Sequence, residues 1–333
     1  MEKQVVVSVK TILITLGVLL ALYVTYQLRG ILSILFIALI LVISLEGAIE
    51  YLQKLNFMNK PLPRVLAVLL TYTTFLFVLV LVFTTAVPLI VSQAQKLVSN
   101  FSYFLVNLKV DEQSLFESLN FLDVLSQVTN KESISSVVIS SVSAVSSFLT
   151  LIVIAIYMSL DWLNIKTRFL GIFRKKARKD AEEVLESVED DVGSWVKGQV
   201  LLMLVVGIFN LVGYMAAGIN YPFALGFIAG VLEIVPVIGP FFSAVVSTAV
   251  GFSQSSTKGF MALGVAVLVQ QLENNFLVPK IMEKVSGFSP LVILLALLVG
   301  NEFFGIVGAI LAVPMTMILA IIVRKFVHYP TKS

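Results

Sequence analysis

The chain has 333 residues, of which 58% are apolar and 13% are charged, and its formal net charge is +3. Soluble domains usually contain about 25% charged residues and less than 50% apolar ones, so this composition excludes an ordinary cytosolic enzyme, a disordered tail and a nucleic-acid-binding protein. The absence of cysteine and the presence of a single histidine, His328, exclude disulfides, thiolate metal sites and paired histidine ligands. We therefore expect no metal site and no cofactor.

Long uncharged runs recur along the whole chain. A bilayer core about 30 Å thick is crossed by roughly 20 apolar residues of helix. Continuous apolar runs, in place of an alternating pattern, exclude a β-barrel. The sequence therefore predicts an all-α polytopic membrane protein with about eight transmembrane helices. The expected spans are 11–28, which we interpret as a retained first helix, 30–48, 65–90, 142–161, 198–217, 222–252, 259–278 and 288–323.

The spans and the segments between them divide the chain into six parts. Between Asp161 and Lys197 there are eight lysine and arginine residues, and basic short loops stay in the cytoplasm. With eight crossings, both termini are then cytoplasmic. The expected parts are an N-terminal three-helix membrane part (1–92), an extracytoplasmic amphipathic helical segment (93–141), the fourth membrane helix (142–161), a cytoplasmic charged helical segment (162–197), a C-terminal membrane part with the transport motifs (198–325) and a cytoplasmic tail (326–333).

Two of the expected spans are too long for one straight helix. The stretch 222–252 has Pro236, Gly239 and Pro240 at its middle, and proline inside a helix removes a hydrogen bond and clashes with the preceding turn. We expect two half-helices or a hairpin there, with a simple kink as the alternative. The stretch 288–323 is interrupted around Gly305. Broken helices are common in transporters, but the sequence does not decide whether either stretch returns to the side it entered.

Three acidic residues, Glu233, Glu273 and Glu302, stand inside apolar sequence. A carboxylate in the bilayer is costly, so it usually faces a cavity or a partner. None of the three has a lysine or arginine within the same helical turn, so a proton, a sodium ion, a substrate or a distant lysine would have to neutralise it. We predict that they take part in transport or ion coupling.

Glu273 has polar neighbours. Gln270, Glu273 and Asn274 share one face of a helix, and Asn275 follows them. These side chains are candidates for the transport pathway together with Glu233. The alternative is a hydrogen-bonded cluster between helices, because Asn and Gln commonly join membrane helices.

The stretches GVLEIVPVIGP, QQLENNFLVPKI and FSPLVILLALLVGNEFFGIVGAILAVP, together with PRVLAVLL, resemble the autoinducer-2 exporter family of bacterial membrane proteins. The resemblance covers nearly the whole chain and implies a secondary transporter of the bacterial inner membrane. Some members are linked to export of the quorum-sensing signal autoinducer-2, and others to sodium–proton antiport. Glu302 is a weaker match, and Glu283 stands where the family tends to have glycine. The matching residues are Glu233, Pro236, Gly239, Pro240, Glu273, Asn275, Pro279, Pro290, Gly305, Gly308 and Pro314, and we expect the prolines and glycines to form helix breaks or gates.

These observations favour a secondary transporter, not an enzyme. We predict ion-gradient-coupled export of a small polar molecule such as autoinducer-2, and the alternative is a sodium (or lithium)–proton antiporter that uses the intramembrane glutamates. The chain has no Walker motif, no HExxH motif and few catalytic side chains, while a channel or a scaffold stays open. The expected partners are the lipid bilayer, the substrate, protons or sodium, and further copies of the chain in a homo-oligomer, but no nucleic acid.

Overall fold

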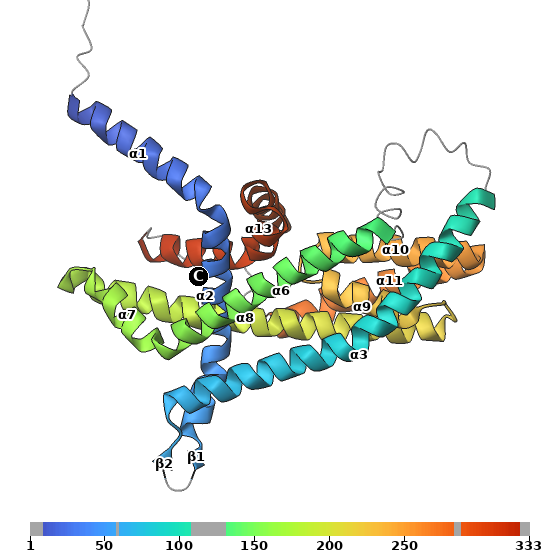
Figure 1. Ribbon diagram of the computed structural model, residues 1–333, viewed down its shortest axis with the longest axis horizontal. Coiled ribbons are helices and arrows are strands. Elements are labelled where there is room, and N and C mark those ends of the chain that lie inside the picture. The colour runs from blue at the N-terminus through green and yellow to red at the C-terminus, as the bar shows by residue number, and fades with distance from the viewer. Residues whose placement is uncertain (1–8, 58–59, 108–130, 283–287, 327–333) are drawn as a thin grey trace, which may run out of the picture.

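The computed structural model describes residues 9–57, 60–107, 131–282 and 288–326 (Figure 1). Nearly all of the described chain is helical, as predicted. The predicted tail after residue 326, Glu283 and much of the predicted outer segment lie outside the described residues. The helices are α1 (Val9–Gln27), α2 (Arg29–Lys54), α3 (Arg64–Asn107), α6 (Lys131–Leu160), α7 (Trp162–Gly171), α8 (Lys175–Ala216), α9 (Pro222–Leu232), α10 (Ile238–Gln254), α11 (Ser256–Leu272), the π-helix η1 (Glu273–Leu277), α12 (Val278–Ile281) and α13 (Pro290–Phe326).

The only described strands form a small ribbon between α2 and α3. In this ribbon β1 (Asn56–Phe57) pairs antiparallel with β2 (Lys60–Pro61). It turns the chain at the exit of α2 and returns it into α3, which is a long helix with one proline, Pro88, in its interior.

The described helices confirm a polytopic membrane protein, but they distribute the expected eight spans differently. Five helices are long and apolar enough to cross a bilayer, and a sixth span results if the bent pair 145–160 and 162–171 is counted as one. Two further apolar helices, Leu13–Gln27 within α1 and α9, are shorter than a crossing helix. The two expected spans without a counterpart among these six are 11–28 and 222–252.

The stretch 222–252 forms a helical hairpin. It forms α9 and α10, which meet at a break between Leu232 and Ile238, and Val237 in this break has a left-handed φ of 69°. The two ends of the hairpin lie together, because the backbone N–H of Asn220 donates to Oε1 of Gln254 at 3.1 Å. Of the alternatives that the sequence left open, the structure therefore has the hairpin and not the simple kink.

The second long stretch, α13, is bent sharply at Gly305. This glycine has φ 62° and ψ −149°, a conformation that is essentially restricted to glycine. Gly300 and Gly308 approach each other so closely that a Cβ on either would clash with the other's backbone. In a straight helix residues eight apart are separated by about 12 Å, so α13 turns back on itself at the predicted interruption.

Close helix contact in the C-terminal half depends on glycine. Gly207 of α8 faces Gly226 and Gly230 of α9, and an added Cβ at Gly230 would lie 2.6 Å from the backbone oxygen of Met203. The small-residue pair Gly226 and Gly230 thus serves packing within the chain.

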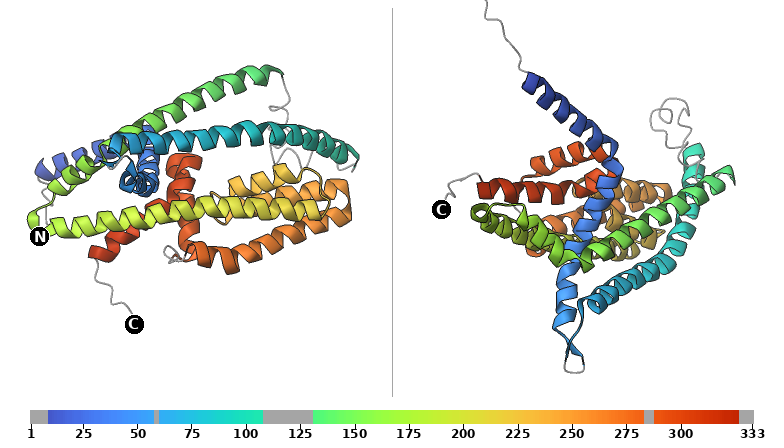
Figure 2. Two further views of the ribbon diagram at one scale, coloured as in Figure 1. Left: turned by 90° about the horizontal axis from the view of Figure 1, so that it is seen from below. Right: turned by 60° about the vertical axis from the view of Figure 1, so that its left-hand side comes forward.

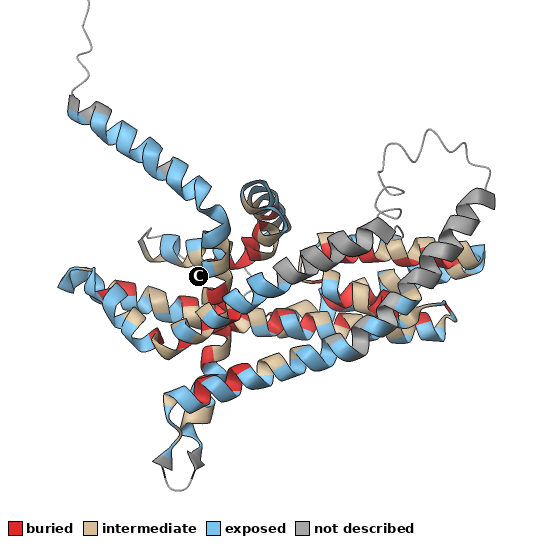
Figure 3. Ribbon diagram, in the orientation of Figure 1, coloured by how far each residue is buried: buried red, intermediate tan, exposed pale blue. Residues whose placement is uncertain are grey.

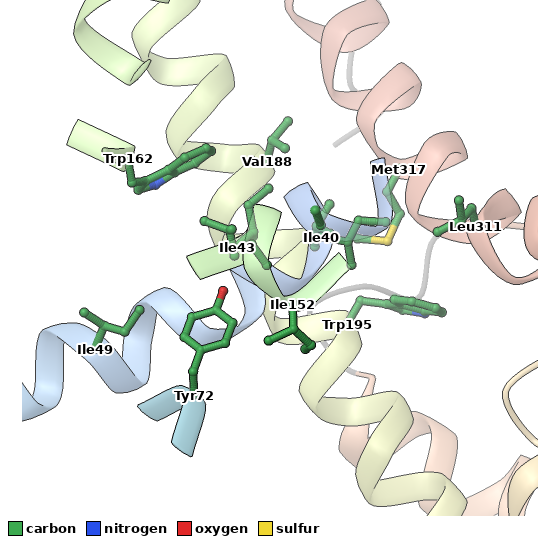
Figure 4. Close-up of a cluster of buried hydrophobic side chains, with 14 of the residues drawn as sticks. Ile40, Ile43, Ile49, Tyr72, Ile152, Trp162, Val188, Trp195, Leu311 and Met317 are labelled. Carbon is green, nitrogen blue, oxygen red and sulfur yellow. The ribbon is translucent and has the colours of Figure 1, made fainter. Parts of the chain in front are cut away.

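The main core lies where α2 crosses α6 and α8, and α13 closes one side of it (Figures 3 and 4). Tyr72 points into this core and its hydroxyl pairs with Oγ of Ser159 at 2.9 Å. Trp195 of α8 lies on the side of the core that faces α13. In contrast, α1 extends away from the other helices and is largely exposed.

The long helix α8 connects the two ends of the molecule. Figure 2 shows it with α7 beside one end and with α9, α10 and α11 gathered toward the other. Forty-two residues of α-helix extend over about 63 Å, which exceeds the thickness of a bilayer. Its N-terminal part carries the charged residues, and its C-terminal part is apolar.

Candidate functional site

A cavity of about 610 Å³ lies between α8, the α9–α10 hairpin, the segment α11–η1–α12 and α13. Its size falls in the range of small-molecule binding pockets. Five polar residues from four elements line it, and the rest of the wall is mainly apolar. The polar residues are Gln199, Glu233, Gln270, Glu273 and Asn274, and the apolar ones are Trp195, Leu202, Pro236, Val237, Pro240, Phe241, Ala244, Ala266, Val267, Val278, Met282, Phe288, Ile293 and Val313.

Glu233 occupies the break of the α9–α10 hairpin. Glu233 is only 2% exposed, and its backbone oxygen accepts a 2.6 Å hydrogen bond from Nε2 of Gln199. A carbonyl at a helix end has no partner within its own helix, so the amide of Gln199 supplies the missing donor. The side chain of Glu233 is thereby held at the tip of the hairpin, beside the cavity.

Glu273 is the first residue of the π-helix η1, which interrupts the α-helical path between α11 and α12. Single π-turns inside helices are frequent at functional sites because the extra residue reorients neighbouring side chains. Glu273 is 5% exposed, and its side chain interacts with those of Glu233 and Gln270. The wider turn therefore brings the second carboxyl group to the first.

Each of the two glutamates has a buried Oε2 atom without a hydrogen-bond partner in the described structure. No lysine, arginine or histidine lines the cavity among the residues described. Two adjacent buried carboxyl groups repel each other when both are ionised, and an unpaired buried charge is costly. The geometry therefore fits a pair that holds one proton or one monovalent cation.

The structure brings together only part of the predicted site. Pro236 and Pro240 line the cavity at the hairpin break, and Gly239 is buried there against the backbone of Leu232. Asn275 points elsewhere, since its amide donates to the backbone and side-chain oxygens of Gln271. Pro279 is exposed in α12.

The predicted residues of α13 lie away from the carboxyl pair. Glu302 is exposed and does not line the cavity, and Gly305 forms the bend three residues later. Gly308 is buried against Gly300, and Pro314 is fully buried within the second half of α13. These residues shape the helix that closes the cavity, while the residues that α13 contributes to the wall are Ile293 and Val313.

Two cavity residues of α8, Trp195 and Gln199, were not among the predicted site residues. Gln199 had a recognisable signal, because it is a polar residue inside an apolar run and such residues often face a cavity or a partner. Trp195 had none, since a tryptophan at the start of a membrane helix is common as an interfacial anchor. Among the described residues, no group of three or more acidic or histidine side chains lies together as a metal site would require.

Known proteins resemble this chain over most of its length. The family described as AI-2E family transporter matches residues 12–328. The chain is 30% identical over 278 residues to the "Putative transport protein YueF" of Bacillus subtilis, covering 78% of this chain and 75% of that protein. It is 29% identical over 305 residues to a "Putative transport protein" of Thermotoga maritima, covering 87% and 90%. Over 191 residues it is 26% identical to the "Putative permease PerM" of Escherichia coli K12, covering 54% of each.

Proposed function

Because the chain belongs to the AI-2E family of transporters, we propose that it is a secondary transporter in which the cavity holds the transported molecule and Glu233 and Glu273 hold the coupling ion. The observation that carries this proposal is the pair of buried carboxyl groups, each with an unpartnered oxygen, inside a cavity of ligand size. A carboxyl group that binds first one ion and then another needs an oxygen atom that no other protein group occupies.

Export of a small polar molecule such as autoinducer-2 is the first candidate. Gln199, Gln270 and Asn274 offer amide donors and acceptors to the hydroxyl groups of such a molecule. Release of autoinducer-2 from cells that contain or lack the protein tests this substrate. We expect the extracellular signal to fall at least several-fold when the protein is absent, and an unchanged signal would exclude autoinducer-2 as the cargo.

Sodium–proton antiport is the second candidate, and the two unpartnered Oε2 atoms favour it. A carboxyl pair that can hold either a proton or a sodium ion has the chemistry of an exchanger. In this case no organic cargo is required, and the cavity serves as the access route of the ion.

Proton movement in everted membrane vesicles tests the coupling. A pH-sensitive dye would report the response to added sodium or lithium. We expect Glu233→Gln and Glu273→Gln each to lower a cation-dependent response at least tenfold. The matched control is Glu302→Gln, which removes an intramembrane carboxyl group that lies outside the cavity.

The outcomes separate the candidates. A cation-dependent response that both cavity variants lose and the control keeps supports coupling through the pair. A response that survives both cavity variants contradicts it. No response in the native protein, with the protein verified in the membrane, excludes sodium and lithium antiport and leaves autoinducer-2 export to its own test.

The membrane orientation belongs to the proposal as well. The basic residues around α7 and the first turns of α8 support a cytoplasmic position for that end of the molecule. The junctions at Asn220 and Ser255 then face the outside of the bacterial inner membrane, and the ends of the chain are cytoplasmic. A homo-oligomer stays a prediction.

A further inference from the structure

We propose that the cavity also binds small organic cations that carry an apolar group, and that each cation replaces a proton held by Glu233 and Glu273. This inference extends the proposed function. It rests on that function because both depend on the same carboxyl pair. It adds a class of ligand that neither autoinducer-2 export nor sodium–proton exchange includes.

The charge of the cavity selects for cations. Its only ionisable lining residues among those described are Glu233 and Glu273. The charged residue of α8 closest in sequence to the cavity wall, Lys197, lies instead beside Gly47 of α2, where its Nζ would be 3.1 Å from an added Cβ. An anionic ligand would find no countercharge in the described wall, whereas a cation meets two carboxyl oxygens that lack any other partner.

The wall of the cavity selects for an apolar group on that cation. Aromatic side chains come from three separate segments: Trp195 from α8, Phe241 from α10, and Phe288, which precedes α13. Aromatic rings attract cations through their faces, and tryptophan does so most strongly. A quaternary or alkyl ammonium group can therefore satisfy the carboxyl pair while its apolar part contacts the wall.

The surface around the cavity favours an organic cation over a hydrated metal ion. Three apolar residues that line the cavity remain well exposed: Val237 is 49% exposed, Phe241 64% and Val267 49%. In a membrane protein such an apolar rim faces lipid, where a hydrated inorganic ion is costly. An organic cation with an apolar body partitions into this region and reaches the cavity from the side.

Charge balance fixes the exchange. Two adjacent carboxyl groups that hold one proton carry a single negative charge, and replacing this proton with a monovalent cation leaves the net charge of the site unchanged. Binding then releases the proton to solvent, and the pair carries two negative charges beside one positive charge. The groups that face the pair from α8, α11 and η1 are Gln199, Gln270 and Asn274, and all are neutral. No other described group on the wall can take up the released proton.

The chain provides its own reporter of binding. It contains two tryptophans, and only Trp195 lines the cavity. In the full-length protein with Trp162→Phe, the fluorescence of Trp195 reports occupancy of the site. The protein is placed in lipid nanodiscs, and empty nanodiscs correct for partition of the probe into lipid.

Three probes share a phenyl ring and differ in charge: benzyltrimethylammonium, benzyl alcohol and phenylacetate. We expect benzyltrimethylammonium to bind at least tenfold more tightly than the other two. We also expect its binding to release protons in weakly buffered solution. Glu233→Gln and Glu273→Gln should each weaken its binding at least tenfold, and Glu302→Gln should leave it unchanged. The comparison among probes requires no carboxyl variant, so it stays informative if a variant fails to fold.

Several outcomes would overturn the inference. Equal binding of phenylacetate or benzyl alcohol would show that charge does not select the ligand. Binding of the cation without proton release, or with no effect of either cavity variant, would place it away from the pair. If the cation does not bind while sodium-dependent proton movement persists in vesicles, this inference fails and the proposed coupling stands. If the cation binds with proton release and vesicles show no coupled movement, the proposed transport fails and the binding site stands.

Discussion

Arg64 and Glu46 form a nearly buried ion pair where α2, α3 and α6 meet. Nη1 of Arg64 lies 2.8 Å from Oε1 of Glu46, and the side chains are only 15% and 9% exposed. The same guanidinium donates twice to the backbone oxygen of Ser159, whose hydroxyl pairs with Tyr72. One residue at the start of α3 thus satisfies polar groups on both neighbouring helices. Lysine could not replace it, because its single ammonium group lacks the planar array of donors of the guanidinium.

We therefore expect Glu46→Gln to lower the free energy of unfolding by about 3 kcal/mol, because it leaves the Arg64 charge buried without its counterion. Adding Arg64→Met removes that charge as well, so the double variant should lose less than the sum of the two single losses. Denaturant unfolding in detergent measures both values. The control is Lys325→Gln, which breaks the more exposed contacts of Lys325 with Asp180 and Glu183 and should cost much less, because solvent screens exposed ion pairs. A Glu46→Gln loss no larger than that of the control would contradict the prediction.

At the residue scale, the sequence identified both glutamates as candidates, but it predicted neither their pairing nor their neighbour Gln199 on α8. Glu233 and Glu273 were recognisable because an acidic residue in an apolar run is costly to bury and therefore usually has a functional role. Gln199 carries the same kind of signal in a weaker form, since an uncharged amide costs less to bury. Glu302 carries the stronger signal and yet is exposed at the bend of α13, because only tertiary packing decides which acid faces a cavity.

The helices of the C-terminal half are held together by glycines that leave no room for a side chain. Gly230 and Gly264 make a matched pair for testing this, because both are helical but only Gly230 faces a backbone. An added Cβ at Gly230 would lie 2.6 Å from the backbone oxygen of Met203, whereas nothing lies within 4 Å of one at Gly264.

We expect Gly230→Ala to destabilise the protein by about 1–3 kcal/mol, because the α8–α9 contact must open to admit the methyl group. Gly264→Ala should be neutral or stabilising by up to about 1 kcal/mol, because alanine is the better helix former. Thermal unfolding of the two variants in the same detergent compares them. Equal melting temperatures would show that α9 is not held by this contact.

At the element scale, the sequence predicted each break but not the course of the chain beyond it. Pro236, Gly239 and Pro240 identify the interruption because they cannot continue a helix. Whether α10 continues across the membrane or returns depends on contacts distant in sequence, such as the hydrogen bond between Asn220 and Gln254. The π-turn at Glu273 has no local signature at all, since its residues are acceptable in an ordinary helix.

At the scale of the whole molecule, two sharply bent segments flank the cavity. The α9–α10 hairpin begins and ends near Asn220, at the far end of α8 from its charged part. The bent helix α13 ends beside that charged part, where Nζ of Lys325 lies 3.2 Å from Oδ1 of Asp180. The membrane part of α8 separates these two regions, so α10 and α13 end near opposite ends of the same long helix. The cavity between them is thereby closed by elements anchored at different ends of the molecule.

This arrangement makes a prediction about membrane topology that the chain is well suited to test, because it contains no cysteine. Single cysteines at Asn220, Ser255 and Ile172 can be labelled with a membrane-impermeant maleimide, and the cysteine-free protein is the blank. If α9–α10 is a hairpin, Asn220→Cys and Ser255→Cys should be labelled from the same side. Ile172→Cys, which is exposed between α7 and α8, should be labelled from the opposite side.

With the basic end of the molecule in the cytoplasm, we expect the first two variants to react in intact cells and the third only in everted vesicles. Reaction of Asn220→Cys and Ser255→Cys from opposite sides would show that the stretch crosses the membrane, and the hairpin would be wrong. Reaction of both from the cytoplasm, with Ile172→Cys outside, would keep the hairpin but reverse the orientation. Because the hairpin carries Glu233 at its tip, the first of these results would also remove the geometry that joins this carboxyl group to Glu273.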